Sequence, residues 1–213
     1  MLTSQRVASN RFIPGLGLGK SGTAENSLAL PPPGTNKGGT MEKVILFQTI
    51  HGSRLYGLSH DDSDYDYYTV VDKVKHRKAK YATHSIIGNR DSVVVDFGTW
   101  IEQCKQGVPQ ALEAMFSQKA EVDEIEWFRW AFHVGSNEVF DRYLRTIKSF
   151  AFSEKDPYKR KRHSLRLALN FAQMRKAGRF NPTLARTEVE MISEMAYWYP
   201  EKVYATALAL AWE

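Results

Sequence analysis

The most constraining feature of this sequence is a glycine–serine pair that precedes two aspartates by about ten residues. Residues 44–50 (VILFQTI) are typical of a buried strand and lead through His51 into Gly52 and Ser53. Residues 64–71 (DYDYYTVV) predict a second strand, rich in β-branched and aromatic residues. Asp64 and Asp66 lie two positions apart on it, so we expect both carboxylates on one face of a sheet.

These residue types suit phosphate and metal chemistry. A glycine lets backbone N–H groups approach a phosphate closely, and Ser53 adds a hydroxyl at the same turn. Two carboxylates on one face are the hard oxygen ligands that Mg²⁺ takes when triphosphate oxygens complete its octahedral shell. We therefore predict that Gly52 and Ser53 bind nucleotide phosphates and that Asp64 and Asp66 are catalytic metal ligands. An exposed polar strand is the alternative reading of the two aspartates.

A third carboxylate is expected on the strand predicted at residues 91–97 (DSVVVDF). Asp96 and Asp91 lie five positions apart, so they have opposite phase and cannot both point into one site. Asp96 is flanked by apolar residues, and an acid in that setting needs a polar or cationic neighbour. We therefore choose Asp96 as the third catalytic metal ligand and keep Asp91 as the alternative.

The remaining elements give a small mixed β-sheet followed by helices, an α+β fold. A weaker strand is expected at 81–87, with Gly88 and Asn89 as a turn before the next strand. Helical spacing or start signals then recur over 99–105, 109–117, 124–134, 138–152, 157–177, 183–197 and 201–211. The aromatic cluster that contains Trp127 and Trp130 is expected to lie in a helix–helix core.

Three segments are expected along the chain. Residues 1–40 are rich in Gly and Pro without hydrophobic periodicity, which predicts a disordered tail or linker. Residues 41–120 are expected to form the catalytic core, and residues 121–213 a helical region packed on it. Residues 41–141 hold 11 basic and 16 acidic residues, a net charge of −5, whereas residues 142–190 hold 13 and 4, a net charge of +9. This split suggests that one part gathers cations and the other meets an anion.

The basic segment carries three candidate phosphate-binding residues. Lys159, His163 and Arg166 lie at i, i+4 and i+7 of the helix predicted at 157–177, so one face presents all three. Arginine suits bidentate phosphate contacts, and lysine supplies a point charge. We predict that this face contacts the triphosphate or an RNA backbone; a solvated basic face is the alternative.

Several motifs together resemble a known family. Residues 52–58 (GSRLYGL) followed by 62–66 (DSDYD) resemble the GSxxYG and SDxD motifs of the RNA repair pathway DNA polymerase beta family, in the DNA polymerase beta nucleotidyltransferase superfamily. Residues 91–97 and 107–116 (GVPQALEAMF) are similar to a later strand and helix of that family, although Val108 stands where the family usually has Asn. The helix that carries Lys159, His163 and Arg166 is similar to its K-x-x-x-H-x-x-R-L segment. The resemblance spans about residues 45–182.

The resemblance implies an enzyme that uses an NTP such as ATP and two divalent metal ions, Mg²⁺ or Mn²⁺. We expect transfer of a nucleoside monophosphate to a hydroxyl, with the 3′ end of RNA, or another nucleic-acid end, as the preferred acceptor. A protein acceptor, as in antitoxin-like relatives, is the second hypothesis. A catalytically silent protein that binds nucleotide or RNA is the third.

Composition limits the setting. Hydrophobic residues make up 43% and charged residues 25%, which allows an ordinary globular core. The apolar runs are too short to span a bilayer, so no membrane partner is expected. A single cysteine, Cys104, excludes an intramolecular disulfide, and we expect a cytoplasmic protein.

Overall fold

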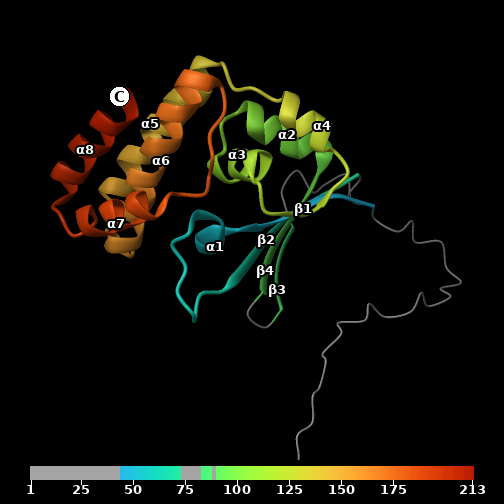
Figure 1. Cartoon of the computed structure of the whole chain (residues 1–213), viewed down its shortest axis with the longest axis horizontal. Coiled ribbons are helices and arrows are strands. Elements are labelled where there is room, and N and C mark those ends of the chain that lie inside the picture. Colours follow the sequence, from blue (N-terminus) through green and yellow to red (C-terminus); the bar gives the residue numbers. More distant parts are fainter. Residues whose placement is uncertain (1–43, 73–82, 88–89) are drawn as a thin grey trace, which may run out of the picture. The chain divides into compact units, whose positions relative to one another are not determined.

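The computed structural model describes residues 44–72, 83–87 and 90–213 (Figure 1). The chain divides between Thr40 and Met41, and the described residues all belong to the second unit, Met41–Glu213. The predicted tail at 1–40 and the predicted turn at Gly88 and Asn89 lie outside the described residues.

A five-stranded mixed sheet carries the first part of this unit. Its strands are β1 (Ile45–His51), β2 (Tyr65–Val71), β3 (Thr83–Ile87), β4 (Arg90–Asp96) and β5 (Ala120–Asp123). They lie in the order β3-β4-β2-β1-β5, with β2 and β4 parallel and all other neighbours antiparallel. The first four strands agree with the sequence prediction to within two residues. The four-residue β5 was missed because it is too short for hydrophobic alternation to show.

Eight helices complete the described part of the chain. They are α1 (Gly52–Tyr56), α2 (Phe97–Lys105), α3 (Pro109–Phe116), α4 (Glu126–Ala131), α5 (Asn137–Ala151), α6 (Pro157–Ala177), α7 (Arg186–Met195) and α8 (Pro200–Trp212). The longest, α6, has the bounds that the sequence predicts. Asp156 caps its first turn ahead of Pro157, and Gly178 ends it in the left-handed conformation. The α+β class is therefore confirmed.

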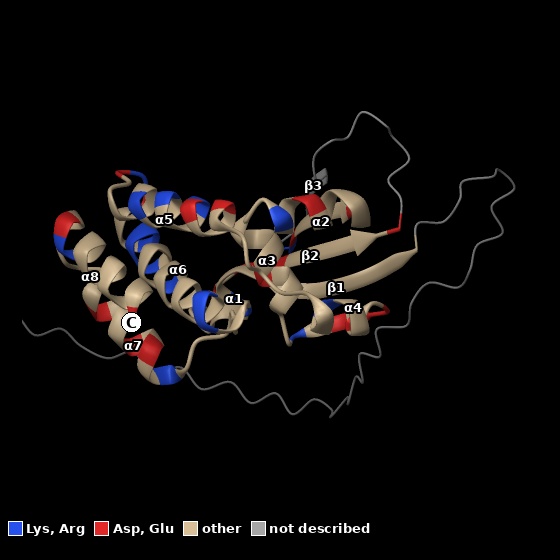
Figure 2. Ribbon diagram, turned by 90° about the horizontal axis from the view of Figure 1, so that it is seen from above, with Lys and Arg blue, Asp and Glu red and all other residues tan. Residues whose placement is uncertain are grey.

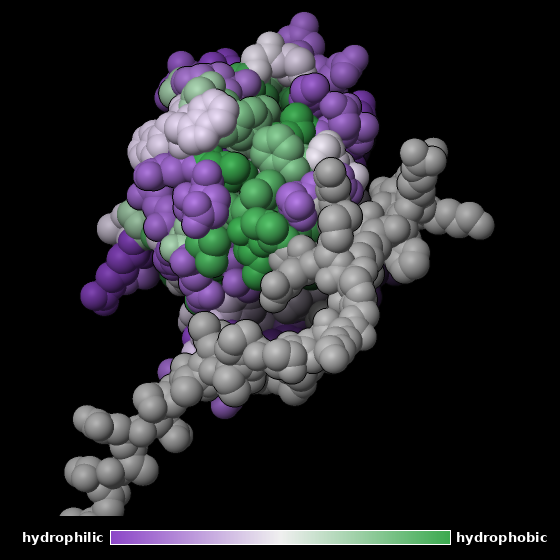
Figure 3. All heavy atoms as spheres, turned by 90° about the vertical axis from the view of Figure 1, so that its right-hand side faces the viewer, coloured by the Kyte–Doolittle hydropathy of each residue, from purple (hydrophilic) through white to green (hydrophobic). Residues whose placement is uncertain are grey.

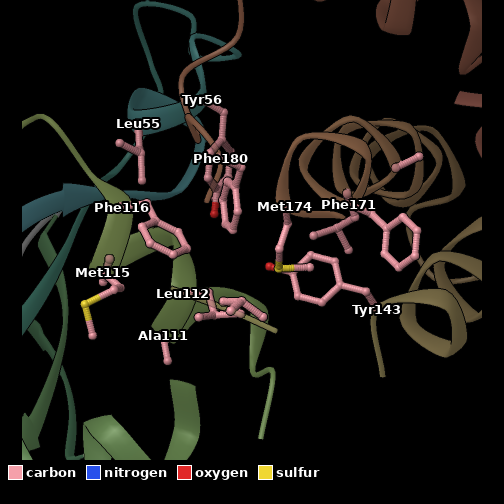
Figure 4. Packing of buried hydrophobic residues seen from close by; sticks show 14 of the residues in the cluster. Leu55, Tyr56, Ala111, Leu112, Met115, Phe116, Tyr143, Phe171, Met174 and Phe180 are labelled. Carbon is pink, nitrogen blue, oxygen red and sulfur yellow. The ribbon is translucent and has the colours of Figure 1, made fainter. Parts of the chain in front are cut away.

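One hydrophobic core joins the sheet to the helices. Helix α3 is buried from Ala111 to Phe116, and its side chains meet α1 on one side and the α5–α6 pair on the other (Figure 4). Phe116 packs edge-on against Phe180, which follows α6, with ring centroids 5.0 Å apart. Tyr143 of α5 also contacts the Phe180 ring. Because this core is continuous, α6 is held in a fixed place beside the turn between β1 and α1.

Some large hydrophobic side chains stay on the surface. Trp127 and Trp130 of α4 are 74% and 59% exposed, so the prediction that they belong to a helix–helix core is wrong. Helix α4 has only six residues, and the core is reached instead by Phe128 and Phe132. Figure 3 shows hydrophobic residues gathered on one face of the molecule. Among the described helices, none combines the length and the apolar character that crossing a bilayer requires.

Candidate active site

The turn between β1 and α1 is built around a glycine that cannot be replaced without displacing an acid. Gly52 has φ 65°, a left-handed conformation that favours glycine. A Cβ at this position would lie 1.8 Å from Oδ2 of Asp66. The carboxylate of Asp66 therefore occupies the space that a side chain at position 52 would fill. This contact places one predicted metal ligand directly against the predicted phosphate-binding turn.

Two distant segments hold α1 in place through its backbone carbonyls. The Nζ of Lys119 donates to the carbonyl oxygens of Arg54, at 2.7 Å, and Leu55, at 3.3 Å. Thr183 donates its hydroxyl to the Leu55 oxygen at 3.0 Å, and the N–H of Leu184 donates to the Tyr56 oxygen at 3.2 Å. Carbonyls that a five-residue helix leaves unpaired are thus satisfied by the fold. The turn that carries Gly52 and Ser53 is fixed before any substrate binds.

The strand register brings Asp91, not Asp96, to Asp66. Asp66 of β2 lies opposite His51 of β1 and opposite Asp91 of β4. Directly opposed residues point to the same face of a sheet, so Asp66, His51 and Asp91 share one face. Asp64 lies just before β2, in the loop that leads into the strand, rather than on the strand as predicted.

Arg54 fixes the loop that delivers Asp64. Its guanidinium donates to the carbonyl oxygen of Ser63 at 2.6 Å and to that of Asp64 at 3.2 Å. The same guanidinium lies 3.8 Å from the centre of the Tyr65 ring. Sequence reasoning gave Arg54 no role, although an arginine next to a phosphate-binding turn was a visible signal.

Asp96 lies at the other end of β4 and serves a different purpose. Its register partner is Val71, five residues along β2 from Asp66, and it therefore faces the opposite side of the sheet. Its carboxylate accepts a hydrogen bond from the Thr99 N–H at 3.0 Å and caps α2. Burial would raise the pKa of Asp96, but the Thr99 hydrogen bonds lower it overall. The expectation that Asp96 joins Asp64 and Asp66 is corrected: the structure does not bring it to them.

The pKa of Asp66 is perturbed by the acids around it. Burial raises the pKa of Asp66, and Asp91 and Asp64 raise it further by like-charge repulsion. His51 and Lys159 act in the opposite direction. Lys159 is exposed at the start of α6, so the predicted cation does come within electrostatic range of the predicted metal ligand.

The acidic residues beside the turn could supply only part of a metal-binding shell. In the described part of the chain, no group of three or more His, Cys, Asp or Glu side chains is arranged to hold a metal ion. Mg²⁺ is commonly held by one or two carboxylates together with substrate phosphates. Asp66 and Asp91, which face each other across adjacent strands with Asp64 nearby, fit that requirement. The repulsion that raises the pKa of Asp66 is what a bound cation would relieve.

Comparison with known proteins identifies the family of the chain. Residues 37–198, more than half of the chain, match the RNA repair pathway DNA polymerase beta family. The chain belongs to this family. No match was found among curated proteins or among solved structures. Membership in a polymerase beta-like family associates the chain with nucleotidyl transfer and RNA repair.

A buried charge network lies behind the turn in this member of the family. We use this name for His51, Tyr56, Glu113 and Arg166. Glu113 of α3 accepts a hydrogen bond from the Tyr56 hydroxyl at 2.5 Å and from Nη1 of Arg166 at 2.6 Å. Its Oε2 lies 3.3 Å from Nε2 of His51, and the guanidinium of Arg166 lies 3.7 Å from the centre of the Tyr56 ring.

The charges in this network compensate one another. Burial alone would raise the pKa of Glu113, but Arg166 and His51 lower it to about 2. Burial would lower the pKa of Arg166, and Glu113 raises it instead. Glu113 was missed by sequence reasoning, although an acid inside the apolar run ALEAMF signals a buried ion pair.

Two of the three predicted phosphate-binding residues of α6 are corrected by this packing. Arg166 is 3% exposed, and its charge is taken up by Glu113. Burial, followed by the charge of Arg166, lowers the pKa of His163 to about 3, so the ring is neutral near pH 7. It packs between the rings of Tyr56 and Phe150. The three residues do share one face of α6, but only Lys159 is exposed.

Proposed function

We propose that this protein transfers a nucleoside monophosphate from an NTP to the 3′ hydroxyl of RNA. The observation that carries the proposal is the contact between Gly52 and Asp66, which brings the predicted phosphate-binding turn against a predicted metal ligand. Membership in an RNA repair family supports the choice of RNA as acceptor.

In the proposed reaction, the 3′ hydroxyl of RNA releases its proton to solvent, and its oxygen forms a bond to the α-phosphorus of the NTP. The bond from that phosphorus to its bridging oxygen breaks, and pyrophosphate leaves. Ser53 and the backbone N–H groups of the turn bind the terminal phosphates. Anchoring of α1 by Lys119, Thr183 and Leu184 keeps these donors in position, which lowers the reorganisation required in the transition state.

Asp66, Asp91 and Asp64 would hold the divalent cations, Mg²⁺ or Mn²⁺. Two such ions would stabilise the attacking and the leaving oxygen of an in-line displacement. Lys159 adds a cation beside Asp66 and favours the approach of the polyanionic substrate.

The experiment is an incubation of the protein with Mg²⁺ and each of the four NTPs, labelled at the α-phosphate. Two RNA oligonucleotides of one sequence are supplied, one with a free 3′ hydroxyl and one with a blocked 3′ end. Total protein is supplied in a third reaction, and EDTA in a fourth.

The proposal expects label on the RNA with the free 3′ hydroxyl and none with the blocked end or with EDTA. Label on protein with none on RNA would show that the acceptor is a protein and not RNA. Label on neither macromolecule would overturn nucleotidyl transfer altogether.

A further inference from the structure

Helix α5 carries a polar hollow that the predicted site does not use. Arg142, Arg145, Thr146 and Ser149 line a volume of about 360 Å³. Their spacing of i, i+3, i+4 and i+7 puts them on one side of the helix. Tyr143 and Ile147 of the same helix are fully buried and face the core. The α5 hollow, as we call it, is therefore a surface feature beside the core and not a packing defect within it.

The chemistry of the α5 hollow suits phosphodiesters. Two guanidinium groups supply planar pairs of N–H donors, and the Ser149 hydroxyl adds a neutral donor of the kind that contacts phosphate and sugar oxygens. The Thr146 hydroxyl donates to the carbonyl oxygen of Arg142 at 2.8 Å. None of the four lining residues is acidic. Arg142 directs one donor to the carbonyl oxygen of Gln106 at 3.3 Å, which holds the side chain against the end of α2. An arginine positioned in this way loses less conformational freedom when it binds a phosphate.

The α5 hollow connects to the candidate active site through the start of α6. Ser149 is followed by Phe150, whose ring lies 4.7 Å below the guanidinium of Arg160. Phe150 also contacts His163, which in turn contacts Tyr56 of α1. Lys159 precedes Arg160 and acts electrostatically on Asp66. Figure 2 shows Lys and Arg residues along α5 and α6. These contacts join the C-terminal end of α5 to the start of α6, where Arg160 and Lys159 lie.

We propose that the α5 hollow binds the sugar–phosphate backbone of the acceptor RNA, upstream of its reactive 3′ end. The inference rests on the proposed function, since it assigns a path to the acceptor of that reaction. Binding here is independent of base identity, because arginines and hydroxyls on an open surface contact the backbone. The α5 hollow would supply the RNA contacts that Arg166 and His163, which are buried, do not supply.

The test measures binding of a fluorescent single-stranded RNA 12-mer by anisotropy, without NTP or metal, over a series of salt concentrations. The double variant Arg142→Ala/Arg145→Ala is compared with Lys176→Ala/Arg186→Ala, which removes two charges from exposed positions on α6 and α7. Each lost phosphate contact lowers the slope of log K against log salt by about 0.7. We expect the first variant to lose roughly tenfold in affinity and about 1.4 in slope. The second variant should bind like the unmodified protein.

A third variant, Arg142→Lys/Arg145→Lys, separates loss of charge from loss of structure. It keeps both charges, so we expect a salt slope close to that of the unmodified protein, with weaker binding because the guanidinium fork is lost. Thermal unfolding of all three variants checks that the fold is retained. Unchanged affinity and slope in Arg142→Ala/Arg145→Ala would overturn the inference.

Transfer assays distinguish this inference from the proposed function. With the alanine pair at 142 and 145, we expect the KM for the 12-mer to rise about tenfold, while kcat and transfer to a dinucleotide acceptor stay unchanged. If the unmodified protein transfers nothing to RNA, yet binds it through Arg142 and Arg145, RNA binding at the α5 hollow is supported and the proposed function is overturned. If transfer occurs and substitution of the two arginines changes neither RNA affinity nor KM, RNA binding at the α5 hollow is overturned and the proposed function is supported.

Discussion

Two groups of charges adjoin the turn between β1 and α1, and the pKa of the central carboxyl group is shifted in opposite directions in the two groups. At the acidic edge, our name for Asp64, Asp66 and Asp91, like charges and burial raise the pKa of Asp66. In the buried charge network, Arg166 and His51 lower the pKa of Glu113 to about 2. The carboxylates of the acidic edge repel one another, whereas the charges of the buried charge network attract one another.

The turn between β1 and α1 is held rigidly by one group and borders a candidate cation site in the other. A buried ion pair such as Glu113–Arg166 fixes geometry, because breaking it would leave an isolated charge in the interior. Carboxylates that repel one another are stabilised by a cation that arrives with substrate. Substitutions in the buried charge network should therefore act on stability, and substitutions at the acidic edge on catalysis.

The largest expected effect is loss of transfer in Asp66→Asn. Removal of a metal ligand costs several kcal/mol of transition-state stabilisation, so we expect the transfer rate to fall on the order of 10³-fold. The free energy of unfolding should stay equal or rise, because like-charge repulsion with Asp91 and Asp64 disappears. Rates are measured with labelled NTP, and stability by urea unfolding. Asp62→Asn, at an exposed position, is the control and should change neither quantity.

The next largest effect is expected in the buried charge network. Glu113→Gln leaves the charge of Arg166 buried without its partner, and we expect a loss of about 3 kcal/mol or more in the free energy of unfolding. The double variant Glu113→Gln/Arg166→Met should recover most of that loss. A parallel substitution, Glu190→Gln, breaks an exposed ion pair with Arg186 and should have little effect. If Glu113→Gln is as stable as the unmodified protein, Glu113 and Arg166 are not energetically coupled.

A pair of glycines sharpens the role of the turn. Gly52 and Gly57 both have positive φ, so Gly→Ala strains the backbone at either position, by roughly 1 kcal/mol. At Gly52 the new Cβ must also displace the Asp66 carboxylate, whereas at Gly57 the nearest atom lies 3.8 Å away. We expect Gly52→Ala to abolish transfer and Gly57→Ala to retain most of it at a similar cost in stability. Equal transfer activities of Gly52→Ala and Gly57→Ala would show that the contact between Gly52 and Asp66 is not needed for the reaction.

The smallest predicted effect is a loss of stability at low pH that comes from His163. The pKa of His163 is lowered to about 3 in the folded protein, against about 6.5 unfolded, so the unfolded chain binds the extra proton between these values. Stability from this residue is present above pH 6.5 and is lost as the pH falls towards 3, by about 2 kcal/mol at pH 5. His163→Phe removes the titration, so its stability should fall less between pH 7 and pH 5. Parallel urea midpoints for both proteins across this range would contradict the expectation.

The local part of the site could be predicted from sequence. The order of Gly52, Ser53 and Asp66 along a strand, a turn and a strand is written in adjacent residues. The bounds of α6 follow from Asp156, Pro157 and Gly178, which act through the backbone within one or two turns.

The non-local part could not be predicted. Alternation along β4 shows that Asp91 and Asp96 point to opposite faces, but only the register with β2 decides which of them meets Asp66. Likewise, the helical spacing places Arg166 on one face with Lys159, but its partner Glu113 lies 53 residues away in the sequence. A long-range ion pair removes Arg166 from the surface, and no local pattern records that pairing.

The register of β4 therefore supplies the most direct test of the account. Transfer of labelled nucleotide to the free 3′ end of RNA is measured for Asp91→Asn and Asp96→Asn. Asparagine still caps a helix, so Asp96→Asn should keep α2 intact and transfer within a few-fold of the unmodified rate. Asp91→Asn should reduce the rate by roughly 10²- to 10³-fold, because it removes a proposed metal ligand that faces Asp66. Loss of transfer in Asp96→Asn with activity retained in Asp91→Asn would contradict the proposed site.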